Sequence, residues 1–272
     1  MRLSRIDDGR DPRLADYAGV REPARLRDRG LLIAEGRFVV RRLLGAGHVR
    51  VRSLLLNDAA AQAFDDLLAR VNDDLDVYVA APDVITTATG FNMHRGCLAL
   101  AERPEPRSID SLLTINPFVV VLEQVVDPDN VGSVFRSAEG LGADAILLSP
   151  GCGDPYYRKA IRTSSGATLV VPFAPADPWP DALDDLRVRG FTIAALTPEA
   201  GALELAEFAE TDAARVPLAV LLGNEGQGLS APALARSDVR IRIPMRGALD
   251  SLNIATAAGI TLYRLQEART RL

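Results

Sequence analysis

Short apolar runs alternate along the chain with segments in which apolar residues recur at helical spacing. In the first part, this pattern predicts four strands and two helices, the strands at residues 31–34, 51–56, 77–80 and 97–101 and the helices at residues 37–44 and 59–71. In the second part, it predicts six strands, at residues 117–124, 145–149, 169–173, 191–196, 217–222 and 239–244. This alternation predicts an α/β fold.

The strands of the second part are nearly continuous runs of leucine and β-branched residues, which is typical of parallel strands covered on both faces. Two helices with one apolar stripe each are predicted in this part, at residues 130–141 and 252–269. The stripe of the first comprises Val131, Val134, Phe135, Ala138 and Leu141. Ser133, Arg136 and Gly140 therefore fall on its opposite face.

The two parts meet at residues 102–108, where two prolines and several charged residues interrupt the periodicity. A segment of this composition is typical of a linker. At 272 residues, the chain is long enough for two domains that each bury a core. We therefore predict one domain over residues 1–105 and a second over residues 106–272.

The composition is that of an ordinary globular protein, with 48% hydrophobic and 25% charged residues. No apolar run approaches the length of a membrane helix, and the N-terminus lacks the apolar core of a signal peptide. We therefore expect a cytoplasmic protein without membrane contact. Cys97 and Cys152 are too few for a disulfide framework and lack the spacing of a zinc site. We expect each to be a small buried apolar residue, and we expect no metal site.

The net charge of -5 excludes a uniformly basic nucleic-acid-binding surface. Lys159 is the only lysine, so nearly all basic residues are arginines. Any contact with RNA is therefore expected to come from local arginine patches.

Three polar, glycine-containing segments each follow a predicted strand of the second domain, at the end where parallel sheets bind ligands. The first covers residues 127–136. In it, Asp129 or Asn130 is expected to cap the following helix, and Gly132 allows a close approach. Arg136 follows on the polar side of the helix. Taken alone, this segment is better explained by a plain helix cap and a solvated arginine.

The second segment, residues 221–230, contains three glycines and one carboxylate but neither the Lys-Ser/Thr of a P-loop nor a GxGxxG spacing. An ordinary turn with Ser230 as a helix cap explains it equally well. In the third segment, residues 243–254, a helix cap explains Ser251 about as well as a functional role does, whereas Asn253 is predicted inside the last helix. Asparagine is unfavourable there unless its amide has a function.

Together and in this order, the three segments resemble the motifs of the SpoU/TrmH family, RNA 2'-O-ribose methyltransferases of the SPOUT class. The pattern NxGxxxR at residues 130–136 resembles the first motif. GNEGQG at residues 223–228 resembles the second, and IPMRGxxxSLNIA at residues 243–255 resembles the third. The resemblance covers roughly residues 117–269, more than half of the chain.

The resemblance implies an α/β domain with a parallel sheet and a deep C-terminal trefoil knot, a rare exception to the rule that folds are unknotted. It implies S-adenosylmethionine as the cofactor, bound within the knot. The implied cofactor-binding residues are Leu196, Thr197, Leu222, Gly223, Asn224, Gly228, Ile243, Met245, Leu252 and Asn253. Among these, Gly223, Ile243 and Leu252 are expected to hold the adenine through backbone groups.

The implied catalytic residues are Arg136, Asn130, Ser251, Asn253 and Glu225. Family members act as homodimers, so Arg136 is expected to reach the cofactor pocket of the partner subunit. Because a guanidinium stays protonated, we expect Arg136 to orient and stabilise rather than to accept a proton. Glu225 is expected to fix a nearby arginine. The two histidines, His48 and His94, lie outside the motifs, so no imidazole base is expected.

The first domain resembles the small α/β substrate-binding domain of many such enzymes, which is similar to kink-turn-binding ribosomal proteins. Its candidate RNA surface comprises Arg37, Arg41, Arg42, Arg50, Arg52 and the turn at residues 90–95. For each of these, a solvated surface residue is an equally good explanation.

An N-terminal domain of this size favours 23S ribosomal RNA as the substrate, with transfer RNA as the alternative. A non-catalytic RNA-binding or ribosome-assembly protein on the same fold is a further alternative. The intact Asn130, Arg136, Ser251 and Asn253 argue against it. A Rossmann-type oxidoreductase is not supported, because no glycine fingerprint follows an early strand.

Overall fold

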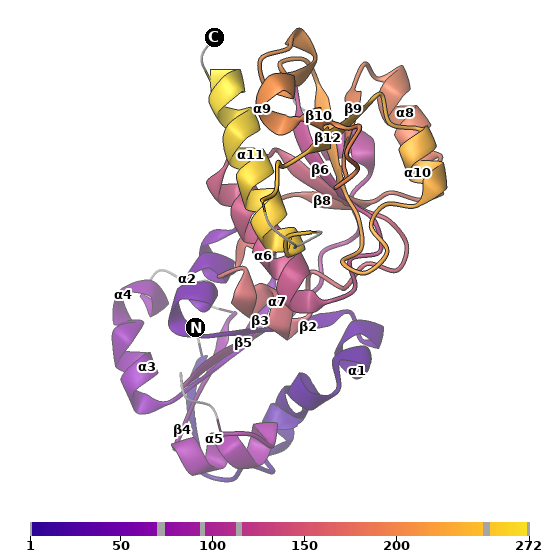
Figure 1. The fold of residues 1–272 in the computed structure, drawn as a ribbon. Coiled ribbons are helices and arrows are strands. Elements are labelled where there is room, and N and C mark those ends of the chain that lie inside the picture. Colours follow the sequence, from indigo (N-terminus) through magenta and orange to yellow (C-terminus); the bar gives the residue numbers. More distant parts are fainter. Residues whose placement is uncertain (1, 70–73, 93–95, 113–115, 247–250, 271–272) are drawn as a thin grey trace. The chain divides into compact units, whose positions relative to one another are not determined.

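The computed structural model describes residues 2–69, 74–92, 96–112, 116–246 and 251–270 (Figure 1). The chain divides into two compact units. Unit 1 contains Met1–Glu105 and Pro155–Val170, and unit 2 contains Pro106–Asp154 and Val171–Leu272. The sequence pattern did not indicate that residues 155–170 group with the N-terminal part.

Unit 1 contains a five-stranded mixed sheet. Its strands, in spatial order, are β1 (Arg2–Ile6), β4 (Asp76–Ala80), β3 (Val51–Leu56), β5 (Cys97–Glu102) and β2 (Leu31–Glu35). β1 and β3 run parallel to β4, whereas β5 runs antiparallel to β3 and β2. β1 was not predicted, because only its last residue, Ile6, is buried and the strand shows no apolar run.

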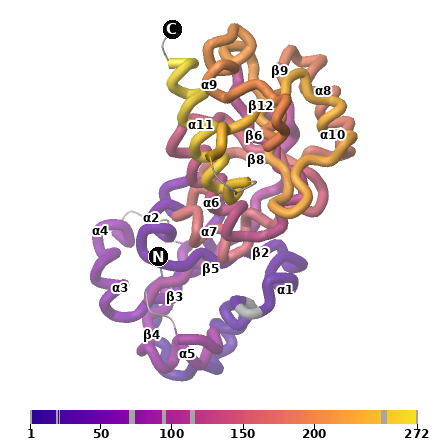
Figure 2. Tube along the Cα trace, viewed as in Figure 1, coloured from indigo at the N-terminus to yellow at the C-terminus, as the bar shows by residue number. Residues whose placement is uncertain are grey.

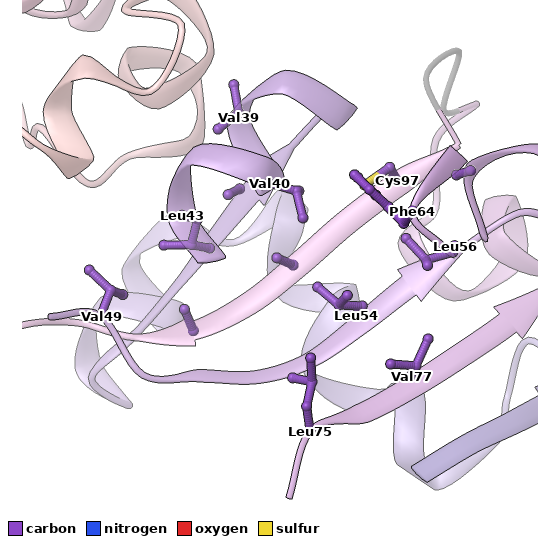
Figure 3. Close-up of a cluster of buried hydrophobic side chains, with 14 of the residues drawn as sticks. Val39, Val40, Leu43, Val49, Leu54, Leu56, Phe64, Leu75, Val77 and Cys97 are labelled. Carbon is purple, nitrogen blue, oxygen red and sulfur yellow. The ribbon is translucent and has the colours of Figure 1, made fainter. Parts of the chain in front are cut away.

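Short helices accompany this sheet: α1 (Pro23–Asp28), α2 (Arg37–Gly45), α3 (Asp58–Ala63), α4 (Asp65–Leu68), α5 (Pro82–Thr89) and α7 (Arg158–Thr163), with 3-10 turns η1 (Pro12–Arg21) and η3 (Ala167–Leu169). α2 packs on β2 and β5, and its Val39, Val40 and Leu43 belong to the same buried cluster as Leu54 and Leu56 of β3 (Figure 3). The single helix predicted at residues 59–71 is α3 followed by α4, and its last two residues lie outside the described part.

Residues 155–170 contribute to the hydrophobic core of unit 1 and form an ion pair with it. Ile161 and Leu169 belong to the same buried cluster as α2. Arg158 donates to the buried Glu35 over 2.6 Å, and its guanidinium lies 4.9 Å from the centre of the Phe91 ring. A buried carboxylate needs such a partner, so this ion pair anchors the returning segment.

Unit 2 contains a seven-stranded sheet in which all neighbouring strands are parallel. In spatial order the strands are β10 (Leu203–Glu204), β12 (Val239–Arg242), β9 (Thr192–Leu196), β11 (Leu218–Leu222), β6 (Phe118–Leu122), β7 (Ala145–Leu148) and β8 (Phe173–Pro175). Every residue of β6 and β11 is buried, as the continuous apolar runs predicted. The predicted α/β fold with a parallel sheet is confirmed.

The helices of unit 2 are α6 (Pro128–Gly140), α8 (Ala182–Val188), α9 (Leu205–Phe208), α10 (Ala231–Ala235) and α11 (Ile254–Thr270), with 3-10 turns η2 (Ile109–Leu112) and η4 (Asp212–Ala214). α11 packs along α6, and the two lie side by side in Figure 1 and Figure 2. The predicted stripe of α6 is buried at Val131, Val134, Phe135 and Ala138.

The strand predicted at residues 169–173 is wrong. Leu169 ends the turn η3 and is buried in unit 1, whereas Phe173 begins β8 in unit 2. Leu169 is buried in the core of unit 1, whereas Val170 is exposed and Phe173 is only half-buried, so this apolar run does not form one strand.

The two cysteines differ in burial. Cys97 is fully buried in the core of unit 1, as predicted, and burial raises the pKa of its thiol to about 12. Cys152 is only half-buried, and its thiol donates to the carbonyl of Leu122 over 3.3 Å. Among the helices that the structure describes, none is long and apolar enough to cross a membrane.

Candidate functional site

Four segments converge at the carboxyl-terminal edge of the unit 2 sheet. The strands β12, β9, β11 and β6 are consecutive neighbours and run in the same direction. The segments after them therefore leave the sheet at the same edge, where ligands of open α/β sheets bind. Three of these segments are the predicted motifs, and the fourth begins at Thr197.

The segment after β6 begins α6 with a capped first turn. The Asp127 carboxylate accepts from the backbone N–H of Asp129 over 2.8 Å, and Pro128 occupies the first helical turn. The cap was expected at Asp129 or Asn130, so that prediction is wrong by two or three residues. Because Asp127 caps the helix, the amide of Asn130 is available for other contacts.

Asn130 joins the three motifs through its side chain. Its Nδ2 donates to Oε1 of Glu225 in the segment after β11. Its Oδ1 accepts from Nδ2 of Asn253, just before α11, over 3.1 Å. The expected arginine partner of Glu225 does not occur within the described ranges, where Asn130 takes that place. The three motifs thus form one connected polar group.

Asn253 was predicted inside the last helix, but it precedes α11, which begins at Ile254. Its Oδ1 accepts from the backbone N–H groups of Ala255 and Thr256, over 2.9 and 3.4 Å. Asparagine is among the preferred residues at this capping position. One amide therefore caps the helix through its oxygen and contacts Asn130 through its nitrogen.

The segment between β11 and α10 is a tight glycine loop, residues 223–229. A Cβ added to Gly223 would lie 2.3 Å from the carbonyl carbon of Gly228 and 2.4 Å from the nitrogen of Leu229. Asn224 Oδ1 accepts from Gly226 N over 2.8 Å, and Gly228 N donates to the Asn224 carbonyl over 2.8 Å. The loop therefore requires glycine at 223.

This loop is also tied to the end of β6. Asn224 Nδ2 donates to the carbonyl of Gln124 over 2.9 Å. Gln124 has a φ of 51°, a left-handed conformation that is uncommon for residues other than glycine. Its backbone N–H donates to the Ser149 hydroxyl over 3.0 Å. The segments after β6, β7 and β11 thus fix one another.

A cavity of about 390 Å³ lies at this edge of the sheet. Its lining consists of Leu196, Thr197, Pro198, Glu199, Leu222, Gly223, Asn224, Glu225, Gly226, Gln227, Gly228, Leu229, Leu234, Ile243, Met245, Ser251, Leu252, Ile254 and Ala257. Its size falls within the range of small-molecule sites. The cavity wall consists of apolar strand ends and a loop in which Gly223 allows two backbone segments to come close. Such a wall suits a flat, weakly charged group of a ligand that is held by backbone groups.

All predicted cofactor-binding residues line this cavity except Asn253. Of the predicted catalytic residues, Glu225 and Ser251 line it, whereas Asn130, Arg136 and Asn253 do not. Their roles stay predictions. The lining residues that were not predicted as site residues are Pro198, Glu199, Gly226, Gln227, Leu229, Leu234, Ile254 and Ala257. Glu199, whose carboxylate pairs with Arg240 over 2.7 Å, follows the predicted strand end by only three residues, so proximity was the available signal. Leu234, on the short helix α10, offered none.

Arg136 is exposed on α6. Within the described part of the chain, no hydrogen-bond or ion-pair partner of its guanidinium is found, and Arg136 does not line the cavity. Arg246, at the third motif, is also exposed. His48 lies in unit 1, and His94 lies outside the described residues. Among the described residues, the Arg136 side chain therefore has no hydrogen-bond or ion-pair partner.

Comparison with known proteins agrees with this geometry. Residues 117–263 match the SpoU rRNA Methylase family. A relative from Mycobacterium bovis, an uncharacterized tRNA/rRNA methyltransferase, is 42% identical over 268 residues, covering 95% of this chain and 90% of the relative. The Bacillus subtilis enzyme RlmP, a 23S rRNA (guanosine(2553)-2'-O)-methyltransferase, is 24% identical, covering 97% of this chain and all of the relative.

Solved structures resemble the whole chain. An RNA 2'-O ribose methyltransferase is 28% identical with a TM-score of 0.80, covering 98% of this chain and 100% of its own. An AdoMet-bound rRNA methyltransferase from Sinorhizobium meliloti is 25% identical with a TM-score of 0.82, covering 99% of this chain and 98% of its own. The resemblance found in the three motifs is confirmed. The chain belongs to the SpoU rRNA methylase family of RNA methyltransferases.

Proposed function

We propose that this protein transfers a methyl group from S-adenosylmethionine to a ribose 2'-hydroxyl of RNA. One observation supports this most strongly. The polar group of Glu225, Asn130 and Asn253 joins three motifs beside a cavity built from a glycine loop and apolar strand ends. A protein that only binds RNA would not need two amides and a carboxylate hydrogen-bonded to one another beside a cavity for a small molecule.

The residues of the cavity fit the cofactor. Backbone groups at Gly223, Ile243 and Leu252 would hold the adenine, and the strand end at Leu196 and Thr197 would cover it. The related S. meliloti enzyme was crystallised with AdoMet, which supports the assignment. When bound, S-adenosylmethionine supplies an electrophilic methyl group on a sulfonium.

The protein's own residues would position the hydroxyl and stabilise its charge. Alignment of reacting groups can supply much of the rate enhancement. Arg136 stays protonated, so it would bind the ribose oxygen or the adjacent phosphate and stabilise developing alkoxide charge. Asn130, Ser251 and Asn253 would orient the nucleotide through hydrogen bonds. Neither histidine belongs to a motif, so we propose no imidazole base.

We propose that the enzyme is a homodimer with a shared active site. Arg136 is exposed and does not line the cavity of its own subunit, so it would act in that of the partner. α11, which packs along α6, exposes the large side chains of Ile260 and Tyr263, 40% and 62% exposed. Burial of such side chains would favour association of two copies.

Three of the five candidate RNA-binding arginines of unit 1 form ion pairs within the described part of the chain. Arg41 pairs with Asp66, and Arg50 and Arg52 both pair with Glu102, so these charges are partly neutralised. On α2, Arg37 and Phe38 are exposed, and the Arg42 guanidinium lies 5.8 Å from the Phe38 ring. We propose that this end of α2 contacts RNA, because arginine and an exposed aromatic ring together suit phosphates and unpaired bases.

The proposed target is 23S ribosomal RNA, with transfer RNA as the alternative. The whole-chain relatives named for rRNA, from B. subtilis and S. meliloti, support the first, whereas the M. bovis relative is named for both. We also retain two proposals from the family resemblance, the trefoil knot in unit 2 and the likeness of unit 1 to kink-turn-binding proteins. Part of the turn at residues 90–95 and residues 247–250 lie outside the described residues.

The test of this function is methyl transfer. Purified protein, radiolabelled S-adenosylmethionine and unmodified 23S ribosomal RNA are expected to give one 2'-O-methylated ribose, mapped by resistance to alkaline cleavage. Transfer RNA in place of ribosomal RNA decides between the two substrates. Binding of RNA without methyl transfer to either would instead identify a non-catalytic RNA-binding protein.

Asn253 separates a structural from a catalytic role. Asn253→Ala is expected to lower both the methylation rate, at least tenfold, and the free energy of unfolding, by about 1 kcal/mol, because the helix cap is lost. Asn253→Asp keeps the capping oxygen but loses the Nδ2 donor to Asn130, so the rate should fall without loss of stability. Single-turnover kinetics and thermal unfolding measure both. A fully active Asp variant would show that Asn253 is only a cap.

A further inference from the structure

Glu123 is a buried carboxylate that the proposed mechanism does not use. It follows β6 and is only 3% exposed. Its Oε1 accepts from Trp179 Nε1 over 2.7 Å and from the Ser230 hydroxyl over 2.6 Å, and its Oε2 accepts from Ser230 N over 2.8 Å. In the part of the chain that the structure describes, no arginine or lysine pairs with it. Three uncharged donors therefore stabilise a carboxylate whose burial is otherwise unfavourable.

These contacts place Glu123 at both ends of the glycine loop. Its backbone N–H donates to the carbonyl of Leu222, the last residue before the loop, over 2.9 Å. Its carboxylate accepts twice from Ser230, the first residue after the loop. Every residue between these two positions, 223–229, lines the cavity. One residue thus fixes the separation of the two ends of the cavity wall.

Ser230 extends this effect to the next helix. Its hydroxyl donates to Glu123 and accepts from the backbone N–H of Ala233 over 3.3 Å, which caps α10. Leu234 of α10 also lines the cavity. A change at Glu123 would therefore move two adjacent parts of the wall.

We propose that Glu123 is a positioning residue that holds the glycine loop in the conformation that binds the cofactor. It does so without touching the ligand itself, because it does not belong to the cavity lining. The inference rests on the proposed function, since the ligand of the loop is taken to be S-adenosylmethionine.

Glu123→Gln tests the proposal. The substitution keeps the size of the side chain but removes the charge and turns one acceptor into a donor that faces Ser230 N–H. We expect faster hydrogen exchange of the amides of residues 224–230 in the protein without cofactor. We also expect the Kd for S-adenosylmethionine, measured by calorimetry, to rise about tenfold.

Glu35→Gln is the matched control, because Glu35 is also a buried carboxylate, 7% exposed, but lies in unit 1. It should leave both the loop exchange and the Kd unchanged. Trp179 is the only tryptophan, so its fluorescence reports directly on the carboxylate, and its emission should change in Glu123→Gln alone. If Glu123→Gln does not fold, Ser230→Ala is used, with the same direction of change expected in exchange and Kd.

The outcomes separate the inference from the function on which it rests. If wild-type protein and Glu35→Gln bind the cofactor and Glu123→Gln binds equally well with unchanged loop exchange, the inference is overturned and the proposed function stands. If the wild-type protein does not bind S-adenosylmethionine at all, the proposed function fails and the inference fails with it. Faster exchange together with weaker binding supports the inference.

Discussion

Replacement of Arg136 by alanine is expected to abolish methyl transfer while cofactor binding survives. The guanidinium does not belong to the cavity lining of the chain and is proposed to contact the ribose oxygen or the adjacent phosphate, so its loss should leave the cofactor contacts intact. Loss of one group that stabilises transition-state charge typically costs about 100- to 1000-fold in rate. Single-turnover methylation and calorimetry measure the two properties. Arg107→Ala, at an exposed arginine of the linker, is the matched control and should have no effect.

The proposed sharing of the active site between two subunits allows a second measurement of the role of Arg136. A mixture of Arg136→Ala and Gly223→Ala subunits forms heterodimers in which one site combines an intact cavity with an intact arginine. At a cofactor concentration too low to saturate Gly223→Ala, activity should therefore return on mixing two variants that each have little activity. If Arg136 acts within its own subunit, no heterodimer contains a complete site and mixing restores nothing. An Arg136→Ala variant with full activity would remove this residue from the mechanism.

The parallel sheet of unit 2 was predictable because its strands are buried on both faces. All five residues of β6 and of β11 are buried, so each strand is a continuous apolar run. β1, whose burial is limited to Ile6, has no such signal. The apolar run at residues 169–173 was wrongly predicted as a strand. Its first residue, Leu169, packs in unit 1, whereas its last, Phe173, belongs to unit 2. An apolar run indicates buried residues. It indicates a strand only where all of its residues pack in the same core.

The candidate site was predictable from its motifs, but its internal contacts were not. Asn130 and Asn253 are 123 positions apart, and nothing in either local sequence indicates that they share a hydrogen bond. The contacts of Glu123 were even less predictable from the sequence. The sequence pattern placed it only within the strand predicted at residues 117–124 and gave it no role, and its donors Trp179 and Ser230 lie 56 and 107 positions away. Such partners are defined only when the parallel strands bring distant loops to one edge.

Gly223→Ala is expected to remove most of the cofactor affinity. The added Cβ would lie 2.3 to 2.5 Å from backbone atoms of Gly228 and Leu229, and these cannot move without opening the loop. Overpacking of this kind costs about 1–3 kcal/mol. Because the loop forms one wall of the cavity, we expect this cost to appear in binding, as a rise in Kd of roughly 10- to 100-fold.

Gly226→Ala is the matched control for Gly223→Ala. It adds the same methyl group to the same loop, but its Cβ would meet only Asn224 Oδ1, at 3.5 Å, an ordinary contact. Its Kd should stay within about threefold of the wild-type value, which is less than 1 kcal/mol. Equal losses in the two variants would mean that the loop tolerates no side chain at all. An unchanged Kd in Gly223→Ala would mean that the cofactor binds elsewhere, because that substitution must displace the wall of this cavity.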